Sequence, residues 1–252
     1  MAKIALITGA TAGIGEATAE VFAREGYNLI LTGRRLERLD KLAARLNKKY
    51  NVEVAVSSFD VRNRDEVLDN LEKLPAKWKK VNVLVNNAGL SQGLDPIDKG
   101  SIDDWDTMID TNIKGLLYVS RIVSNWMITN GHGHIVNLGS IAGIDVYANG
   151  NVYCATKHAV DALNKGMRID LLPHGIKVTV VHPGAVETEF SEVRFKGDKA
   201  LAKKVYDGFE PLAAVDVAET IWFAVSRPAH VNINEMIVMP TAQANGSLIY
   251  RK

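Results

Sequence analysis

Short apolar runs of strand length alternate with longer amphipathic stretches along the whole chain. Runs such as KIALI (3–7) and VTVV (178–181) are nearly continuously apolar, as parallel strands covered on both faces are. This alternation is typical of βαβ units and a parallel sheet. Strands are predicted in seven segments, 3–8, 28–33, 53–60, 81–89, 133–140, 177–184 and 235–239. The pattern therefore predicts one doubly wound α/β domain over residues 1–252, with a seven-stranded parallel sheet and helices on both faces.

The intervening stretches carry helical periodicity and helix stop signals. In the segment 36–50, apolar residues recur at positions that share one helical face. The segment 14–26 ends in Gly26, and the segment 64–74 ends before Pro75. These segments are predicted to be the helices that connect the strands.

Composition restricts the class of protein further. The chain has 252 residues, 47% of them hydrophobic, and a formal net charge of +1. It can bury a large core, and it carries no excess charge that would attract nucleic acid or an acidic membrane surface. The N-terminal stretch MAKIALITGA has no pattern of a signal peptide or membrane span, so we expect a cytoplasmic protein. Cys154 is the single cysteine, which excludes an internal disulfide.

The first predicted strand opens into TGATAGIG (8–15) and then into a helix. Glycines at this point let the backbone turn tightly and approach a ligand, and the free N–H groups of the helix start form an anion site. Strand, glycines and helix in this order predict a Rossmann-type dinucleotide site. The residues of the turn expected to contact the cofactor are Gly9, Thr11, Gly13, Ile14 and Gly15.

The end of the second predicted strand indicates which dinucleotide binds. A ribose 2′-hydroxyl is normally held by an acidic residue there, whereas a 2′-phosphate requires arginine. This chain has Gly33 at that place, followed by Arg34 and Arg35. Guanidinium groups bind phosphate through charge-assisted hydrogen bonds, so the sequence predicts NADP(H).

Tyr153 and Lys157 stand four residues apart, on one face if the segment is helical. The spacing alone does not distinguish a proton-transfer pair from two residues that are merely one helical turn apart. The glycine pattern G-x-x-x-G-x-G, NNAG (86–89), Asn112, Ser140 and Y-x-x-x-K together resemble the short-chain dehydrogenase/reductase family across essentially the whole chain.

The resemblance implies a catalytic tetrad of Asn112, Ser140, Tyr153 and Lys157. Tyr153 would be the acid or base, and Lys157 would lower the pKa of its phenol from the ordinary value of about 10. Ser140 would hold the substrate oxygen, and Asn112 would hold a water that links Lys157 to solvent. Further cofactor contacts are implied for Asp60, Val61, Asn86, Ala88, Gly89, Pro183, Gly184, Val186 and Thr188.

The region past the sixth strand indicates the substrate. The long, charged segment at about 185–211 suits a lid, and Arg194 and Lys196 are its candidate anion-binding residues. Gln92, Tyr147 and Asn149 are further candidates for the substrate pocket, although each suits a loop or cap equally well. The runs at 182–198, 211–221, 226–236 and 239–244 resemble the NADP-dependent 3-hydroxy acid dehydrogenase group of the family, which includes serine and L-allo-threonine dehydrogenases.

That closer resemblance implies oxidation of the β-hydroxyl of short 3-hydroxy acids such as serine, allo-threonine or 3-hydroxyisobutyrate. Alternatives are a broad-specificity carbonyl reductase, a 3-oxoacyl-carrier reductase, and a non-catalytic NADP-binding regulator. The family also implies a homotetramer associated through the segments 103–128 and 152–173 and the last strand. No metal is expected, because His132 and His134 of GHGH have no evident partner ligand.

Overall fold

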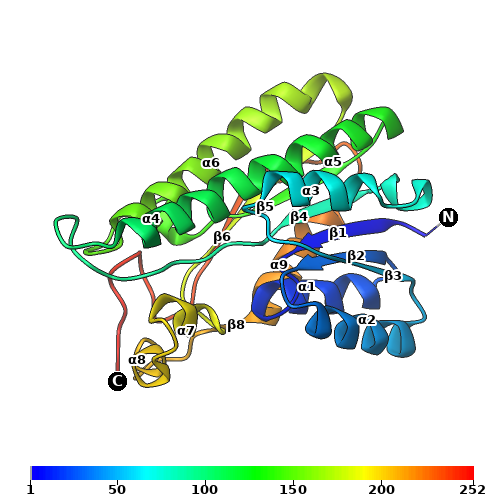
Figure 1. The fold of residues 1–252 in the computed structure, drawn as a ribbon. Helices are drawn as coiled ribbons and strands as arrows, with labels where there is room; N and C mark the ends of the chain where they lie inside the picture. The colour runs from blue at the N-terminus through cyan, green and yellow to red at the C-terminus, as the bar shows by residue number, and fades with distance from the viewer. Residues whose placement is uncertain (1) are drawn as a thin grey trace.

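The computed structural model describes residues 2–252 and has one central parallel sheet (Figure 1). Its spatial order is β3-β2-β1-β4-β5-β6-β9, which confirms the predicted seven-stranded parallel sheet. The strands are β1 (Ile4–Thr8), β2 (Asn28–Gly33), β3 (Val54–Ser58), β4 (Val83–Asn86), β5 (His134–Leu138), β6 (Lys177–Pro183) and β9 (Glu235–Val238).

Helices cover both faces of the sheet because the strand residues are apolar on both sides (Figure 1). Alternate residues of β1 enter different cores, Ala5 and Ile7 one, and Ile4 and Leu6 the other. The first core is closed by α1 (Gly13–Arg24), α2 (Leu36–Tyr50) and α9 (Ala214–Val225). The second is closed by α3 (Arg64–Glu72), α5 (Leu116–Asn130) and the end of α6 (Asn151–Leu171).

The chain reverses its direction of strand addition between β1 and β4. From β1 the sheet grows through β2 to β3 on one side, and from β4 through β5 and β6 to β9 on the other. Loops that leave the carboxyl ends of β1 and β4 therefore diverge, which opens a crevice at this point. Thr8 joins the two loops, because its Oγ1 accepts hydrogen bonds from the N–H groups of Asn87 and Ala88, both at 3.0 Å.

A small insertion follows β6 at the same end of the sheet. It contains a two-stranded parallel sheet of β7 (Val186–Glu187) and β8 (Leu212–Ala213), with α7 (Phe190–Arg194) and α8 (Lys199–Lys204) between them. The C-terminal tail packs against this insertion, and the Lys252 N–H donates to the Gly208 carbonyl at 2.8 Å. In Figure 1 the C-terminus accordingly lies beside α8.

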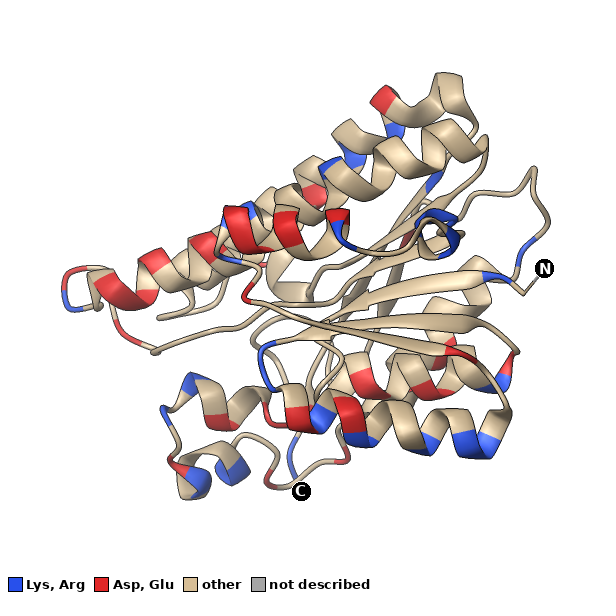
Figure 2. Ribbon diagram, turned by 45° about the vertical axis from the view of Figure 1, so that its right-hand side comes forward, with Lys and Arg blue, Asp and Glu red and all other residues tan. Residues whose placement is uncertain are grey.

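The surface carries both signs of charge. Acidic and basic residues are interspersed over the helices (Figure 2). Among residues 2–252, no helix combines the length and the apolar character needed to cross a bilayer.

Candidate active site

A cleft lies along the carboxyl ends of the central strands. It collects most of the predicted site residues from distant parts of the chain. Those that line it are Gly9, Thr11, Gly13, Ile14, Arg34, Arg35, Asp60, Val61, Ala88, Gly89, Ser140, Tyr153, Lys157, Pro183, Gly184, Val186 and Thr188. Gly15, Asn86 and Asn112 do not line it, and neither do the predicted substrate residues Gln92, Tyr147 and Arg194.

The glycine turn has the shape that a dinucleotide requires. Gly9 adopts φ +67°, and a Cβ there would lie 2.9 Å from the Cα of Ala88. Another residue would therefore strain the turn and fill the approach to the cleft. Gly15 has a packing role instead, since a Cβ there would lie 2.4 Å from the Gly9 carbonyl oxygen and from Asn87 Nδ2. The free N–H groups at the start of α1, next to this glycine cradle, fit a pyrophosphate.

Asn86 does not contact the cleft, contrary to the sequence-based expectation. Its amide is buried beneath α5, where Nδ2 donates to Ser120 Oγ at 2.8 Å and to Asn137 Oδ1 at 2.9 Å. The alternation of β4 places it on the same face as Leu84, toward the interior. The next residue, Asn87, lines the cleft and donates to the Thr8 carbonyl at 2.8 Å.

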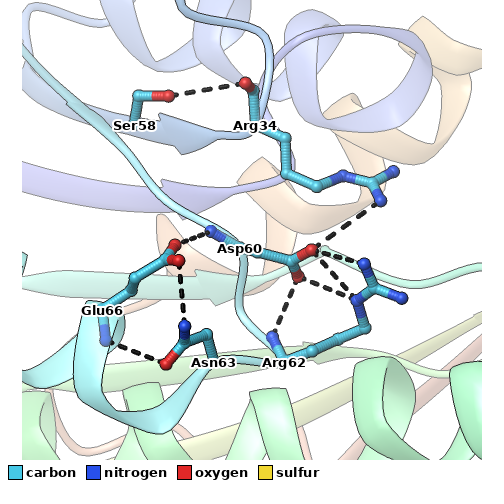
Figure 3. Close-up of polar contacts among 6 residues, drawn as sticks. All are labelled: Arg34, Ser58, Asp60, Arg62, Asn63 and Glu66. Atoms are coloured by element: carbon cyan, nitrogen blue, oxygen red, sulfur yellow. Dashed lines mark hydrogen bonds and ion pairs between the residues drawn. The ribbon is translucent and has the colours of Figure 1, made fainter.

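Arg34 reaches across the end of the cleft toward Asp60 (Figure 3). The two charged groups are 3.9 Å apart, and the Arg34 side chain is 59% exposed, so it is only loosely held. Asp60 is held mainly by Arg62, at 2.7 Å. Partial burial acts to raise the pKa of Asp60, but the hydrogen bonds from Arg62 outweigh it and lower the pKa overall. The Arg34 guanidinium thus remains available to an incoming phosphate.

Arg35 is held more firmly, by a residue that the sequence analysis did not single out. Its guanidinium donates to Thr11 Oγ1 and to the Glu189 carboxylate, each at 2.8 Å. Arg38 binds the other oxygen of Glu189 at 2.7 Å. Hydrogen bonds from the two arginines lower the pKa of Glu189. One carboxylate from the insertion therefore occupies two guanidinium groups beside the cleft.

Replacement of Glu189 by glutamine is expected to tighten NADP binding about two- to fivefold. The carboxylate competes with a phosphate for Arg35 and Arg38, and exposed ion pairs of this kind contribute about 0.2–1 kcal/mol. Titration of cofactor fluorescence would measure the change. Glu192→Gln, in the helix α7 that directly follows Glu189, is the matched control and is expected to leave the affinity unchanged. Weaker NADP binding by Glu189→Gln would contradict the prediction.

Tyr153 and Lys157 lie on the same helix, α6, and both face the cleft with Ser140 from the end of β5. The Tyr153 ring is buried, 7% exposed, and packs 5.6 Å from the Phe190 ring. Lys157 is also buried, and its Nζ donates to the Leu138 carbonyl at 2.9 Å. The structure therefore brings the three side chains to one wall of the cleft.

The pKa of Tyr153 depends mainly on burial. Burial raises the pKa of its phenol, and the Arg194 guanidinium and a hydrogen bond with Ser140 only partly oppose this. Burial also lowers the pKa of Lys157 to about 8, so its charge is itself costly to keep. In the chain alone, loss of hydration thus outweighs the Arg194 guanidinium, and the lowering of the phenol pKa by Lys157 stays a prediction for the enzyme with bound cofactor.

Asn112 lies in a π-helical turn, Asp110–Gly115, between α4 (Ile102–Ile109) and α5. The turn separates α4 from α5, and such turns are frequent at functional sites. The Asn112 amide is buried behind Gly89, where Oδ1 accepts from Leu90 N–H at 2.9 Å and Nδ2 donates to Thr156 Oγ1 at 3.0 Å. Its side chain therefore ties the loop after β4 to α6.

Arg194 is the charged group beside the Tyr153 ring, 5.3 Å from the ring centroid. Its guanidinium donates to Tyr147 Oη at 3.0 Å and to Ser91 Oγ at 3.2 Å. Within residues 2–252 no carboxylate forms an ion pair with it. Gln92 lines a smaller cavity that Tyr153 shares. Lys196 is not part of this group, because it pairs with Asp104 at 2.8 Å.

Comparison with known proteins is consistent with this geometry. The family model described as short chain dehydrogenase matches residues 3–199. The chain belongs to the short-chain dehydrogenase family. This dehydrogenase is 47% identical over 246 residues to the NADP-dependent 3-hydroxy acid dehydrogenase YdfG of Escherichia coli O6:H1, covering 97% of this chain and 98% of the relative.

Two further relatives help to define its chemistry. The closed form of a serine dehydrogenase complexed with NADP⁺ superimposes with a TM-score of 0.92 at 45% identity, covering 99% of each chain. Sulfoacetaldehyde reductase 2 of Chromohalobacter salexigens is 47% identical over 245 residues, covering 97% of this chain and 96% of the relative. This dehydrogenase is an NADP-dependent oxidoreductase, which confirms the cofactor predicted from Gly33, Arg34 and Arg35.

Proposed function

We propose that this dehydrogenase oxidises the β-hydroxyl of short 3-hydroxy acids, of the serine, allo-threonine or 3-hydroxyisobutyrate type, to a carbonyl. The observation that carries the proposal is the position of Arg194, whose guanidinium lies beside the Tyr153 ring without a carboxylate partner among residues 2–252. An acid bound there would hold its β-carbon near the phenol. The names of the related 3-hydroxy acid and serine dehydrogenases support the same class.

Tyr153 is the proposed proton-transfer residue. As a phenolate it accepts the proton of the substrate hydroxyl during oxidation, and as a neutral phenol it donates that proton in the reverse reaction. NADP, when bound, supplies the hydride acceptor for oxidation and the hydride donor for reduction. Because burial raises the phenol pKa in the chain alone, the neutral form that reduction needs is the resting form.

The other tetrad residues support this proton transfer. Ser140 faces the cleft beside Tyr153 and is proposed to donate a hydrogen bond to the substrate oxygen. Lys157 reaches the same wall from one helical turn further along α6 and is proposed to stabilise the phenolate when it forms. Asn112 is proposed to fix the loop at Leu90 against Thr156, next to both groups.

The proposed cofactor contacts follow the cleft. The glycine turn and the start of α1 are proposed to hold the pyrophosphate, and Arg34 and Arg35 the 2′-phosphate. The segment 185–211 is the proposed lid, because it carries both Glu189 at the cofactor arginines and Arg194 at the substrate end. One short segment thus contacts both ends of the cleft.

A second candidate function is reduction of an aldehyde that carries a sulfonate. The relative named sulfoacetaldehyde reductase matches this chain as closely in identity as the 3-hydroxy acid dehydrogenase does. A guanidinium binds a sulfonate by the same paired hydrogen bonds as a carboxylate. Arg194 would therefore hold either anion, and only the substrate comparison below distinguishes them.

Arg194→Met tests the proposed function. We expect kcat/KM for the preferred acid to fall at least about 100-fold, since about two charge-assisted hydrogen bonds are lost, each contributing about 1.5–3 kcal/mol. For uncharged secondary alcohols, kcat/KM is expected to change little. The assay follows NADPH absorbance with serine, allo-threonine, 3-hydroxyisobutyrate, 3-hydroxybutyrate, sulfoacetaldehyde and simple alcohols. Lys196→Met is the matched control, and an equal loss on uncharged alcohols would contradict the role of Arg194.

A homotetramer is the proposed assembly. Large apolar side chains are exposed on the elements that the family uses for association, namely Leu117 on α5, Ile169 at the end of α6 and Ile237 on β9. Exposed apolar groups on neighbouring elements are typical of subunit interfaces.

A further inference from the structure

A buried histidine outside the cofactor cleft has a ring nitrogen without a partner. His182 lies on β6 with its side chain 0% exposed, and its Nε2 makes no hydrogen bond within residues 2–252. The other nitrogen, Nδ1, lies 2.9 Å from the Ser140 carbonyl oxygen, and the Ser140 N–H is further away, at 3.3 Å. A carbonyl oxygen only accepts, so we assign the proton to Nδ1 from the shorter of the two contacts, and in this neutral tautomer Nε2 presents a lone pair.

Two carboxylates face that lone pair from different elements. Glu235 Oε1 on β9 lies 3.5 Å from His182 Nε2, and Asp161 Oδ1 on α6 lies 3.8 Å from it. The three residues can each offer one ligand atom such that these atoms all lie within 4.8 Å of one another. Asp161 Oδ1 is also buried without a partner, while the other oxygen of Asp161 pairs with Lys165 at 2.6 Å. Three electron-rich atoms that face one another in this way repel unless a cation lies between them.

We infer that Asp161, His182 and Glu235 bind a divalent transition-metal ion such as Zn²⁺ or Mn²⁺. Ligand bonds of about 2.1 Å in tetrahedral geometry place ligand atoms about 3.4 Å apart. The two carboxylate oxygens lie 3.5 and 3.8 Å from His182 Nε2, close to that value. One imidazole with two carboxylates suits a transition metal better than Mg²⁺ or Ca²⁺, which take oxygen ligands. Solvent can supply the remaining ligand, because the Glu235 side chain is 40% exposed.

The surroundings of the three residues are those of a metal site. Metal-binding histidines usually donate their second ring N–H to a carbonyl or carboxylate, as His182 does to Ser140. Burial lowers the pKa of His182, which favours the neutral ring that a metal needs, although Glu235 and Asp161 act in the opposite direction. With Lys165 on Asp161, the charges of the two carboxylates are only partly balanced.

The ion would brace the catalytic wall without touching the substrate. His182 immediately precedes Pro183 and Gly184 of the cleft, and its ring holds the backbone of Ser140. The site is therefore a positioning device that joins β6, α6 and β9 behind the active site. The sequence alone does not predict it, because the three ligands are far apart along the chain and show no metal-binding spacing.

Calorimetric titration of the untagged, EDTA-treated protein with ZnCl₂ and MnCl₂ tests the inference. We expect one ion to bind per chain, with weaker binding of MgCl₂ and CaCl₂. At metal concentrations about 100-fold above Kd, the Tm is expected to rise by about 5–10 °C. Glu235→Gln and Asp161→Asn are each expected to lose at least about tenfold in affinity. Glu53→Gln, an exposed carboxylate paired with Lys77 at 2.6 Å, is the matched control and keeps full affinity.

Several results would overturn the site. One is that the wild-type protein binds no divalent ion. Another is that the Asp161 and Glu235 variants bind the ion as tightly as the Glu53→Gln protein does. Nitrogen NMR of the metal-free protein gives a separate readout. A fully protonated His182 ring at pH 7, together with no metal binding, would show that the two carboxylates hold a proton instead of an ion.

Discussion

Tyr153→Phe is expected to lower kcat by about 10³-fold or more while the fold and NADP binding are retained. The substitution removes only the phenolic oxygen, so the ring still fills its buried place beside Phe190, at 5.6 Å. What it removes is the proposed proton-transfer group, and positioned acid–base residues contribute about 10²–10⁴-fold. Ser140 and Lys157 remain at the cleft wall, but neither is proposed to transfer the substrate proton.

Steady-state turnover, NADPH binding and Tm together measure this effect. Tyr118→Phe is the matched control, because Tyr118 on α5 packs against the second core and does not line the cleft. The control should retain wild-type turnover. A Tyr153→Phe enzyme that turns over at close to the wild-type rate would show that another group transfers the proton.

The double substitution Arg34→Ser and Arg35→Ser is expected to reduce kcat/KM for NADP at least about 10²-fold and to leave that for NAD nearly unchanged. Each arginine is proposed to contact the 2′-phosphate, and charge-assisted hydrogen bonds contribute about 1.5–3 kcal/mol each. Removal of the Arg34 side chain is expected to cost the cofactor-free protein little stability. Within residues 2–252, its only ion pair is the 3.9 Å contact with Asp60.

Comparison of kcat/KM for the two cofactors measures the change in preference. Arg45→Ser on α2 is the matched control, because Arg45 is similarly exposed but pairs with Glu16 and Glu20 on α1. If the double variant kept its preference for NADP, other residues would have to bind the 2′-phosphate. Arg38, which pairs with the Glu189 carboxylate, would be the next candidate.

Local sequence rules predicted the features that depend on neighbours along the chain. The strands follow from apolar runs, and the glycine turn is predictable because Gly9 needs a positive φ at a strand-to-helix junction. Asn86 shows the limit of motif matching. The family motif includes Asn86, but the alternation of side chains along the strand directs its amide into the core. The next residue, Asn87, lines the cleft instead.

Contacts between distant segments were not predictable in the same way. The pairing of Glu189 with Arg35 joins residues 154 positions apart, and nothing in either segment specifies it. The same is true of Arg194 with Ser91 and Tyr147. The only indication of the Glu189 pairing in the sequence was its negative charge, opposite to that of the arginines. Many other acidic residues of the chain have the same charge, so Glu189 could not be singled out.

The sequence by itself determined the parallel sheet, the dinucleotide turn, the absence of an acidic residue at Gly33 and the spacing of Tyr153 and Lys157. These are local patterns of polarity, size and backbone freedom. Only the tertiary structure decided the pKa of Tyr153, the pairing of Glu189 and the meeting of Asp161, His182 and Glu235. The physical reason is that desolvation and Coulomb interactions depend on distances in space, which the folded chain sets by bringing remote segments together.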